Sequence, residues 1–358
     1  MAQVRRGGLS RVVIAYTSRP PTIEYLKAAF ARRGVEARAV FADDNTLFDR
    51  LVIHWVNKQA HNFRLVPKSR NLFDNHPSSH LNFRSAQLRS AIRAYDPDLV
   101  FVIRGLGYSP WAVDGARRKF GWWVEADERV EEAMQEVAQY DRYFFINSAS
   151  VEVARRAGYK HTSHLPHAVD PSVFRPLPDV RKDIDFCFVG SWSPKRQKHV
   201  EAAFEVSRNG AVYGPKWWRK MVREVRLWRL VKGRYIGGEA LVRLYNRSKI
   251  VINVTEWGAG AGASRSGMTM RLFEVPATGS FLLTDFSVDM GLSVTPGAHV
   301  ETFSDLDDFQ RKLRFYLDNP HARERIAAQG MARVREHCTY DAMVERLCAA
   351  YDDVRRTA

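Results

Sequence analysis

The stretch IDFCFVGSWSPKR, residues 184–196, changes character at Gly190. Its first six residues are mostly apolar, which is typical of a strand buried on both faces of a sheet. A turn of small and hydroxyl-bearing residues follows, and Pro194 with two cations then opens a helix-like segment that reaches residue 208. A buried strand that feeds a helix through a short turn is the repeating unit of α/β folds.

The same alternation continues on the C-terminal side of this stretch. Short apolar runs predict further strands, at 211–213, 250–254 and 280–284. Helical spacing of apolar residues predicts helices at 268–277 and from residue 305 to the C-terminus. This half of the chain is therefore expected to form a doubly wound, parallel sheet.

The N-terminal half has a similar rhythm. Predicted strands lie at 11–16, 35–41, 99–103, 121–125 and 143–146, and predicted helices at 22–33 and 79–95. Residues 44–78 fit this rhythm poorly, and we interpret them as an insertion or a flexible loop. The sequence thus predicts a second Rossmann-like sheet, formed by the N-terminal half.

A proline-rich segment separates the two halves. Residues 165–183 contain prolines at 166, 171, 176 and 178, a composition typical of a linker. We expect an N-terminal Rossmann-like domain at 1–172, a C-terminal one at 173–340, and a helix at 341–358 that packs back on the N-terminal domain.

Composition narrows the classes of protein and partner. The chain has 358 residues, 45% of them hydrophobic and 27% charged, which is ordinary for globular domains. Its net charge of +15 favours an anionic partner, such as nucleic acid, an acidic membrane face or a phosphorylated small molecule. The three cysteines lack C-x-x-C spacing, so we expect neither a disulfide framework nor a zinc site.

Membrane and export segments are also not expected. The apolar run near the N-terminus, residues 12–16, is too short for a signal peptide, and no stretch approaches the roughly 20 apolar residues of a membrane span. The sequence therefore predicts a cytoplasmic protein in a reducing compartment.

Ligands of open α/β sheets bind beyond the carboxyl ends of strands, and this rule selects the turn after residue 189. Gly190 and Ser191 permit close approach of backbone N–H groups to an anion, and Lys195 or Arg196 could neutralise a diphosphate. The alternative is a helix-capping turn with two solvated cations.

Two further turns in this half are candidates. A glycine-rich loop, residues 258–267, leads to Arg271 and could approach a phosphate, although it matches no nucleotide-binding motif and could equally be a surface loop. Tyr213 and Gly214 follow the run AVY and could hold a base, or the tyrosine could belong to a buried aromatic cluster.

Residues 216–234 carry a local charge excess. They hold eight basic residues against one acid, with apolar residues at helical spacing between them. We interpret them as a basic amphipathic helix, which either faces an anionic membrane or polyanion, or packs its apolar stripe into the core.

The N-terminal half offers carboxylates at strand ends. Glu125 and Asp127 follow the strand GWWVE and are candidates for a general base, with Asp43, Asp44 and Arg104 as further candidates. His164 and His167 are three residues apart, but we expect them to be solvated, because no third metal ligand accompanies them. No catalytic triad or metal-ligand cluster emerges.

Taken in order, six segments of the C-terminal half resemble GT-B fold glycosyltransferases of the CgeB-like family. They are LPHAVDPSVFRP (165–176), DIDFCFVGSWSPKR (183–196), AVYGPKWW (211–218), LYNRSKIVINV (244–254), MRLFEVPATGSFLLTD (270–285) and HCTYDAMVERL (337–347). In the N-terminal half the resemblance is limited to the strand–helix rhythm and WWVEAD (122–127).

The resemblance implies an enzyme that binds a nucleotide-sugar donor, UDP-, GDP- or dTDP-linked, mainly through its C-terminal domain, with the acceptor on the N-terminal side. Glu274 occupies the position of the carboxylate that binds the ribose hydroxyls. The residues implied for the diphosphate and base are Gly190, Ser191, Lys195, Arg196, Tyr213, Gly214, Met268, Thr269, Met270 and Arg271. No other cofactor and no metal is expected.

Stereochemistry and acceptor stay open at this stage. Many retaining GT-B enzymes carry a second glutamate eight positions before the ribose glutamate, and that position is Ser266 here. For inversion, Asp127 or Glu125 would be the base. The leading hypothesis is transfer to the precursor of a cell-surface glycan, glycolipid or protein at the inner membrane face. The alternatives are a glycosyltransferase that modifies nucleic acid and a non-enzymatic polyanion-binding protein on a GT-B scaffold.

Overall fold

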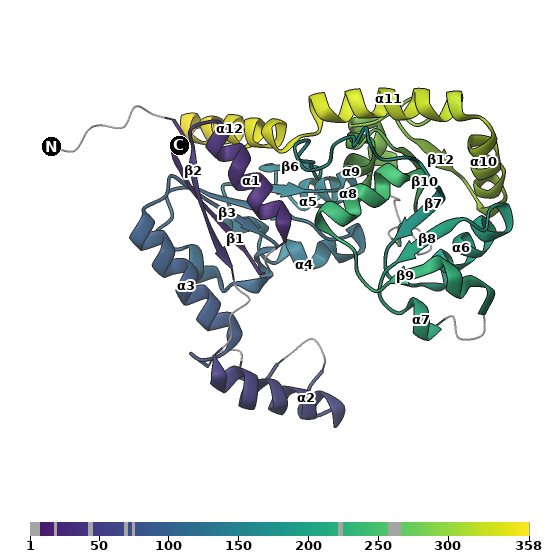
Figure 1. The fold of residues 1–358 in the computed structure, drawn as a ribbon. Coiled ribbons are helices and arrows are strands. Elements are labelled where there is room, and N and C mark those ends of the chain that lie inside the picture. Colours follow the sequence, from purple (N-terminus) through teal and green to yellow (C-terminus); the bar gives the residue numbers. More distant parts are fainter. Residues whose placement is uncertain are drawn as a thin grey trace. The chain divides into compact units, whose positions relative to one another are not determined.

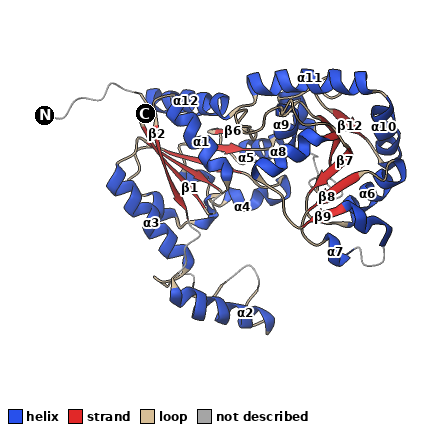
Figure 2. Cartoon of the chain, viewed as in Figure 1, coloured by secondary structure: helices blue, strands red, loops and turns tan. Residues whose placement is uncertain are grey.

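The computed structural model describes residues 8–17, 20–41, 46–67, 71–73, 76–220, 225–256 and 266–357. The chain divides into two compact units, of which unit 1 comprises Met1–Leu165 with Met343–Ala358 and unit 2 comprises Pro166–Ala342. Each unit is built on one six-stranded sheet with helices around it (Figures 1 and 2). This architecture confirms the predicted pair of Rossmann-like, doubly wound sheets.

The sheet of unit 1 has the order β2-β1-β3-β4-β5-β6, and all its neighbouring strands are parallel. Its strands are β1 (Arg11–Tyr16), β2 (Glu36–Phe41), β3 (Leu99–Ile103), β4 (Lys119–Trp123), β5 (Arg142–Phe145) and β6 (Thr162–His164). The central strand β3 reads LVFVI and is buried along its whole length, as expected for a strand covered on both faces.

The helices of unit 1 are α1 (Pro21–Arg32), α2 (His54–Asn62), α3 (His80–Tyr95), α4 (Val130–Met134) and α5 (Ser148–Arg156). Single turns lie between them, at η1 (Asp49–Ile53, a π-helix), η2 (Gly105–Gly107), η3 (Pro110–Val113), η4 (Asp127–Arg129) and η5 (Val137–Gln139). Residues 46–62, which the sequence interpretation assigned to an insertion or loop, thus contain a helix that η1 leads into.

The sheet of unit 2 has the order β12-β11-β10-β7-β8-β9 and is also parallel throughout. Its strands are β7 (Ile184–Val189), β8 (Gly210–Tyr213), β9 (Val231–Gly233), β10 (Ser248–Asn253), β11 (Phe281–Asp285) and β12 (Glu301–Phe303). Successive strands run outward from β7 on one side and from β10 on the other. The order therefore reverses between β7 and β10, and such a switch point is where doubly wound sheets bind ligands.

The helices of unit 2 are α6 (Pro194–Val206), α7 (Trp217–Lys220), α8 (Gly238–Arg247), α9 (Arg271–Ala277), α10 (Leu306–Asp318) and α11 (Pro320–His337). Single turns form η6 (Val225–Leu230) and η7 (Val288–Leu292), and the last helix, α12 (Tyr340–Thr357), begins in unit 2 and ends in unit 1. The expectation of one helix over residues 216–234 was wrong, because the described part of this segment forms α7, η6 and the edge strand β9.

The proline-rich segment has little regular structure, but it is not a loose linker. Between β6 and β7 its only pairing is an isolated bridge from Val169 to Thr339, and Phe174 is buried. Burial also lowers the pKa of His167 to about 4, and Nε2 of His164 lies 3.1 Å from the Ile146 carbonyl oxygen. The expectation that these two histidines are solvated was therefore wrong.

Candidate functional site

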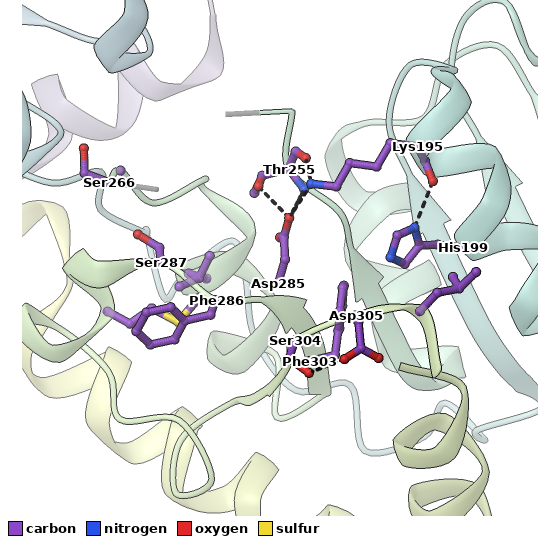
Figure 3. Close-up of a pocket in the computed structure, with 14 residues that line it drawn as sticks. Lys195, His199, Thr255, Ser266, Asp285, Phe286, Ser287, Phe303, Ser304 and Asp305 are labelled. Carbon is purple, nitrogen blue, oxygen red and sulfur yellow. Dashed lines mark hydrogen bonds and ion pairs between the residues drawn. The ribbon is translucent and has the colours of Figure 1, made fainter. Parts of the chain in front are cut away.

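A cavity of about 330 Å³ opens at the carboxyl end of the unit 2 sheet (Figure 3). Residues that follow β10, β11 and β12 line it, together with the first turns of α6. Its polar lining consists of Lys195, His199, Thr255, Ser266, Asp285, Ser287, Ser304 and Asp305. Hydroxyls and carboxylates predominate in this set, so the cavity can hydrogen-bond a ligand that carries several hydroxyl groups.

Lys195 joins the two sides of the switch point. Its ammonium group donates to the Thr255 carbonyl at 2.7 Å and lies 3.1 Å from the Asp285 carboxylate. Asp285 in turn accepts from the backbone N–H and the hydroxyl of Thr255, the latter at 2.7 Å, and Figure 3 shows the three side chains pointing toward one another. The predicted diphosphate ligand Lys195 is therefore held at the cavity wall by Asp285.

Arg196 is engaged by its neighbours as well. Its Nε donates to the Val254 carbonyl at 2.9 Å and lies 3.2 Å from Glu256, while its Nη1 donates to the carbonyl and the hydroxyl of Ser191, each at 3.0 Å. Burial lowers the pKa of Arg196. The guanidinium group thus ties the turn after β7 to the residues that follow β10.

The start of α6 has the cap that the sequence pattern favoured. The Ser193 hydroxyl accepts from the Arg196 backbone N–H at 3.2 Å, Pro194 occupies the first helical position, and the same hydroxyl donates to Glu256. The expected cap is therefore present, but the expectation that the two cations of this turn are solvated was wrong, because Lys195 and Arg196 are both paired with neighbouring residues. The cavity position of Lys195 also leaves the ligand-binding interpretation open.

The backbones at the ends of β7 and β8 are in close contact at Gly190 and Gly214. The Gly190 N–H donates to the Tyr213 carbonyl at 2.8 Å, and the Trp217 indole N–H donates to the Gly190 carbonyl at 2.8 Å. Gly214 has φ +150°, and a Cβ atom on it would lie 1.8 Å from the Gly190 carbonyl oxygen. The Tyr213 ring lies beside Gly233 of β9, where a Cβ atom would be 3.2 Å from it.

Glu274 and Arg271 occupy the first turn of α9. Glu274 is buried, which raises the pKa of its carboxyl to about 7, while the charge of Arg271 opposes this rise. Nη1 of Arg271 donates to Asn253 at the end of β10 at 3.3 Å, and its buried Nε has no hydrogen-bond partner among the described residues. Neither side chain lines the cavity, but Leu272 between them does.

The residues before α9 differ in their placement. Met268 is buried, whereas Thr269 and Met270 are half-buried, and Met270 accepts the backbone N–H of Glu274 at 2.9 Å. Ser266 lines the cavity at the position where many retaining GT-B enzymes carry a glutamate. Residues 258–265 of the glycine-rich loop lie outside the described residues.

In unit 1, the two catalytic candidates have different surroundings. The carboxylate oxygens of Glu125 are bridged by Arg104 at 2.9 Å and by Arg129 at 3.1 Å, so this group is already neutralised on both sides. Asp127 begins η4, two residues farther along. Asp43 and Asp44 lie outside the described residues.

Two groups escaped the sequence interpretation. Asp285 directly follows the predicted strand at 280–284 and ends the observed strand β11, so the strand-end rule that selected Gly190 could have selected it. Glu136 had no such signal: it is buried beneath the turn after β3, where it accepts the Gly105 N–H at 3.2 Å and the Tyr143 hydroxyl. Burial raises the pKa of Glu136 to about 7, against these hydrogen bonds.

Comparison with known proteins adds to this geometry. A glycosyl transferase-like family model matches residues 174–349, which include the cavity and both glycine turns. The spore protein CgeB of Bacillus subtilis (strain 168) is 20% identical over 273 residues, which cover 73% of this chain and 84% of that protein. The C-terminal half therefore matches a glycosyltransferase family, and the two six-stranded sheets are those of the GT-B fold.

Solved structures agree with this fold for the glycosyltransferase. Sucrose-phosphate synthase from Thermosynechococcus elongatus is 13% identical and has a TM-score of 0.69, with 98% of this chain and 100% of that chain covered. Anabaena HepE, solved in complex with UDP and glucose, is 10% identical and has a TM-score of 0.60, with 96% and 100% covered. At these identities the likeness establishes the fold alone.

Two features are absent from the described residues. Across residues 8–357, leaving out the gaps given above, no group of three or more His, Cys, Asp or Glu side chains is arranged to hold a metal ion. Within the same residues, no helix has the length and apolar character needed to cross a membrane.

Proposed function

We propose that this glycosyltransferase binds a nucleotide-sugar donor in unit 2, with the diphosphate and sugar in the cavity at the switch point. The observation that carries the proposal is the joint position of Lys195 and Asp285 in that cavity. A diphosphate would compete with Asp285 for the Lys195 ammonium group, and the released carboxylate could then accept hydrogen bonds from sugar hydroxyls. The serine and threonine hydroxyls of the lining would orient the same sugar.

The rest of the donor is assigned to the residues around the cavity. We propose that Glu274 binds the ribose hydroxyls, since a carboxylate can accept from both hydroxyls of a cis-diol. Arg271, whose Nε is unsatisfied among the described residues, and Arg196 would face the diphosphate with the backbone of Gly190 and Ser191. Tyr213 and Gly214 would border the base. Because Met268 is buried, only its backbone could contribute, alongside Thr269 and Met270.

The cationic side chains around the cavity also bear on whether the reaction depends on a metal ion. We propose that Lys195, Arg196 and Arg271 stabilise the leaving nucleoside diphosphate, in place of a divalent metal ion. Transfer activity that persists in the presence of a chelator is the expected result, and loss of activity that added Mg²⁺ or Mn²⁺ restores would contradict this part of the proposal.

For the acceptor, we propose the anionic precursor of a cell-surface glycan, glycolipid or protein, bound on the cytoplasmic side of the membrane. Support comes from residues 216–220 and 225–234, which expose Trp218, Trp228 and several cations. Arg226 of this segment is paired with Glu205 at 2.7 Å. In unit 1 Asp127 is the stronger candidate for a catalytic base, because two arginines already neutralise Glu125.

The same exposed cations favour one alternative, binding of nucleic acid, either as an acceptor or without catalysis. Stacking of bases on exposed tryptophans beside cations is a common mode of single-strand binding. This alternative predicts affinity for oligonucleotides that falls steeply with salt, without any dependence on nucleotide sugars.

A thermal-shift screen of UDP, GDP, dTDP and their sugar conjugates tests the donor site. A ligand at about 100 times its Kd stabilises the folded state by about 2.7 kcal/mol, which corresponds to about 5–10 °C for a unit of this size. UDP and UDP-glucose are the first probes, because HepE has been solved with both. Absence of any shift at millimolar concentrations would refute donor binding.

A matched pair of variants locates the site. Lys195→Met should abolish the shift, whereas Lys198→Met, on the exposed side of the same helix, should retain it. Lys195→Arg should restore part of the affinity, because it keeps the cation. Equal shifts in Lys195→Met and Lys198→Met would place the diphosphate elsewhere.

A further inference from the structure

The continuous helical segment 47–62, which includes η1 and α2, exposes large apolar side chains along one side. Leu47, Leu51 and Trp55 follow one another at a spacing of four and are 74%, 69% and 59% exposed, and Phe48 and Val52 form a neighbouring row. These five side chains, which we call the apolar face, lie on one side of the helix because residues four apart occupy the same side. Monomeric soluble proteins seldom expose contiguous apolar patches of this kind without a partner.

The opposite side of the same helix is anchored to unit 1. Asp49, Ile53, Asn57 and Ala60 are buried. The Asp49 carboxylate accepts the backbone N–H of His80 at 3.1 Å, and the Asn57 amide oxygen accepts that of Leu72 at 2.7 Å. The helix therefore has its own packing interface. On the apolar face the ring of His76 contacts that of Phe48, and all five side chains of the face are still at least 40% exposed. Figure 1 shows α2 standing away from the sheet, beyond the far end of α3.

Positive charge borders the apolar face. Arg50, His54 and Lys58 are exposed, also at a spacing of four, and form a row along one edge of it. Within residues 46–67 the only acidic side chain is Asp49, which is buried. From residue 46 to residue 95 the sequence holds eight Lys and Arg against two Asp, so this region carries six of the net positive charges.

We propose that the apolar face and its basic edge bind the surface of an anionic phospholipid bilayer, with the axis of α2 parallel to the membrane plane. Trp, Leu and Phe on one face and Lys and Arg beside it are the composition of helices that lie in the headgroup region. A second copy of this chain fits less well, because two such basic edges would repel each other at a shared interface. The inference goes beyond the proposed function, since it does not depend on donor binding.

Vesicle co-sedimentation of the full chain tests this assignment. Binding to phosphatidylcholine vesicles with about a third phosphatidylglycerol should exceed binding to pure phosphatidylcholine and should weaken with salt. Leu51→Glu combined with Trp55→Glu should lower the partition coefficient at least tenfold. The matched control Phe315→Glu, on the exposed side of α10, should bind as the wild type does. Arg50→Gln and Lys58→Gln should each lower it about fivefold at low salt.

Three results would overturn the assignment. One is wild-type affinity of the Leu51→Glu, Trp55→Glu variant for anionic vesicles, and another is failure of the wild type to bind them. The third is a concentration-dependent dimer that the same variant dissociates, which would make the apolar face a contact between copies. Retention of the UDP-induced thermal shift in the variant shows that it is folded and separates this test from that of the donor site.

Discussion

Replacing Glu274 with glutamine should make the protein more stable at alkaline pH and less able to bind its donor. A pKa of about 7 in place of 4.5 means that ionising this buried carboxyl costs about 3 kcal/mol more in the folded chain than in the unfolded chain. Between these two pH values the folded chain binds the proton more tightly. Stability from this group is therefore greatest below pH 4.5, declines as pH rises, and levels off above pH 7.

Glutamine keeps the shape of the side chain and cannot ionise. The stability of Glu274→Gln relative to the wild type should therefore increase by about 2–3 kcal/mol between pH 5 and pH 8, which is about 5–10 °C in Tm. Melting curves of both proteins at the two pH values measure this directly. A difference in Tm that does not change between pH 5 and pH 8 would refute the reasoning about burial.

Glu301→Gln serves as the control. Glu301 is also buried, but its carboxylate is 3.1 Å from the Lys312 ammonium group and accepts the Tyr316 hydroxyl. Neutralising it deprives a cation of a partner, so this variant should be less stable than the wild type at both pH values. The contrast distinguishes a buried carboxylate kept for a ligand from one kept for the fold.

Donor affinity provides the second half of the test. Glu274→Gln should bind UDP about tenfold more weakly, because an amide oxygen is a poorer acceptor than a carboxylate for two ribose hydroxyls. The wild type should prefer UDP over 2′-deoxy-UDP, and the variant should lose most of that preference. Titration calorimetry with both nucleotides gives the two ratios, and an undiminished preference in the variant would remove Glu274 from the ribose site.

Two positions in the turns after β7 and β8 give further predictions. Gly214→Ala should destabilise unit 2 by about 3 kcal/mol or more, because the new Cβ atom would collide with the Gly190 carbonyl oxygen. The control Gly291→Ala should be within about 0.5 kcal/mol of the wild type, because a Cβ atom there meets nothing within 4 Å. Equal Tm values for the two variants would contradict this prediction. Ser193→Ala should lower stability by about 1 kcal/mol through loss of the α6 cap, and urea unfolding with an unchanged midpoint would show that the cap contributes nothing.

The fold could be predicted from the sequence wherever a strand is buried on both faces. RVVIAY, LVFVI and IDFCFV were predicted with the bounds that the structure has, because such strands are mostly apolar runs. The three-residue strands β6, β9 and β12 were missed. TSH, VKG and ETF are too short and too polar to differ from loops, and pairing with a neighbouring strand is what makes them strands.

Residues 216–234 show where periodicity misled. Their apolar residues recur at helical spacing, yet they do not belong to one helix. The buried Trp217 lies in the four-residue helix α7, and the buried Leu227 and Leu230 lie in the 3₁₀ segment η6. Short turns place apolar residues at nearly the same intervals as an α-helix, so spacing alone could not separate the two.

The candidate site could be predicted in part. The rule that ligands bind at strand ends selected Lys195, which lines the cavity. It did not reveal the Asp285 partner, because an ion pair between residues 90 positions apart depends on strand order. Nor could it reveal that Arg104 pairs with Glu125 beside Arg129, since Arg104 follows β3 and Glu125 follows β4.

The path of α12 has a consequence for dissecting the protein. This helix carries the chain back into unit 1, where Val344 and Leu347 are fully buried and Glu345 lies 3.2 Å from Arg33 of the α1 C-terminus. Unit 1 is therefore discontinuous in sequence. A fragment that stops before residue 343 would expose an apolar strip on the N-terminal unit. In the present order unit 2 is an insertion within unit 1, and a circular permutant that joins the two termini and opens the chain at a boundary between the units would make each unit contiguous.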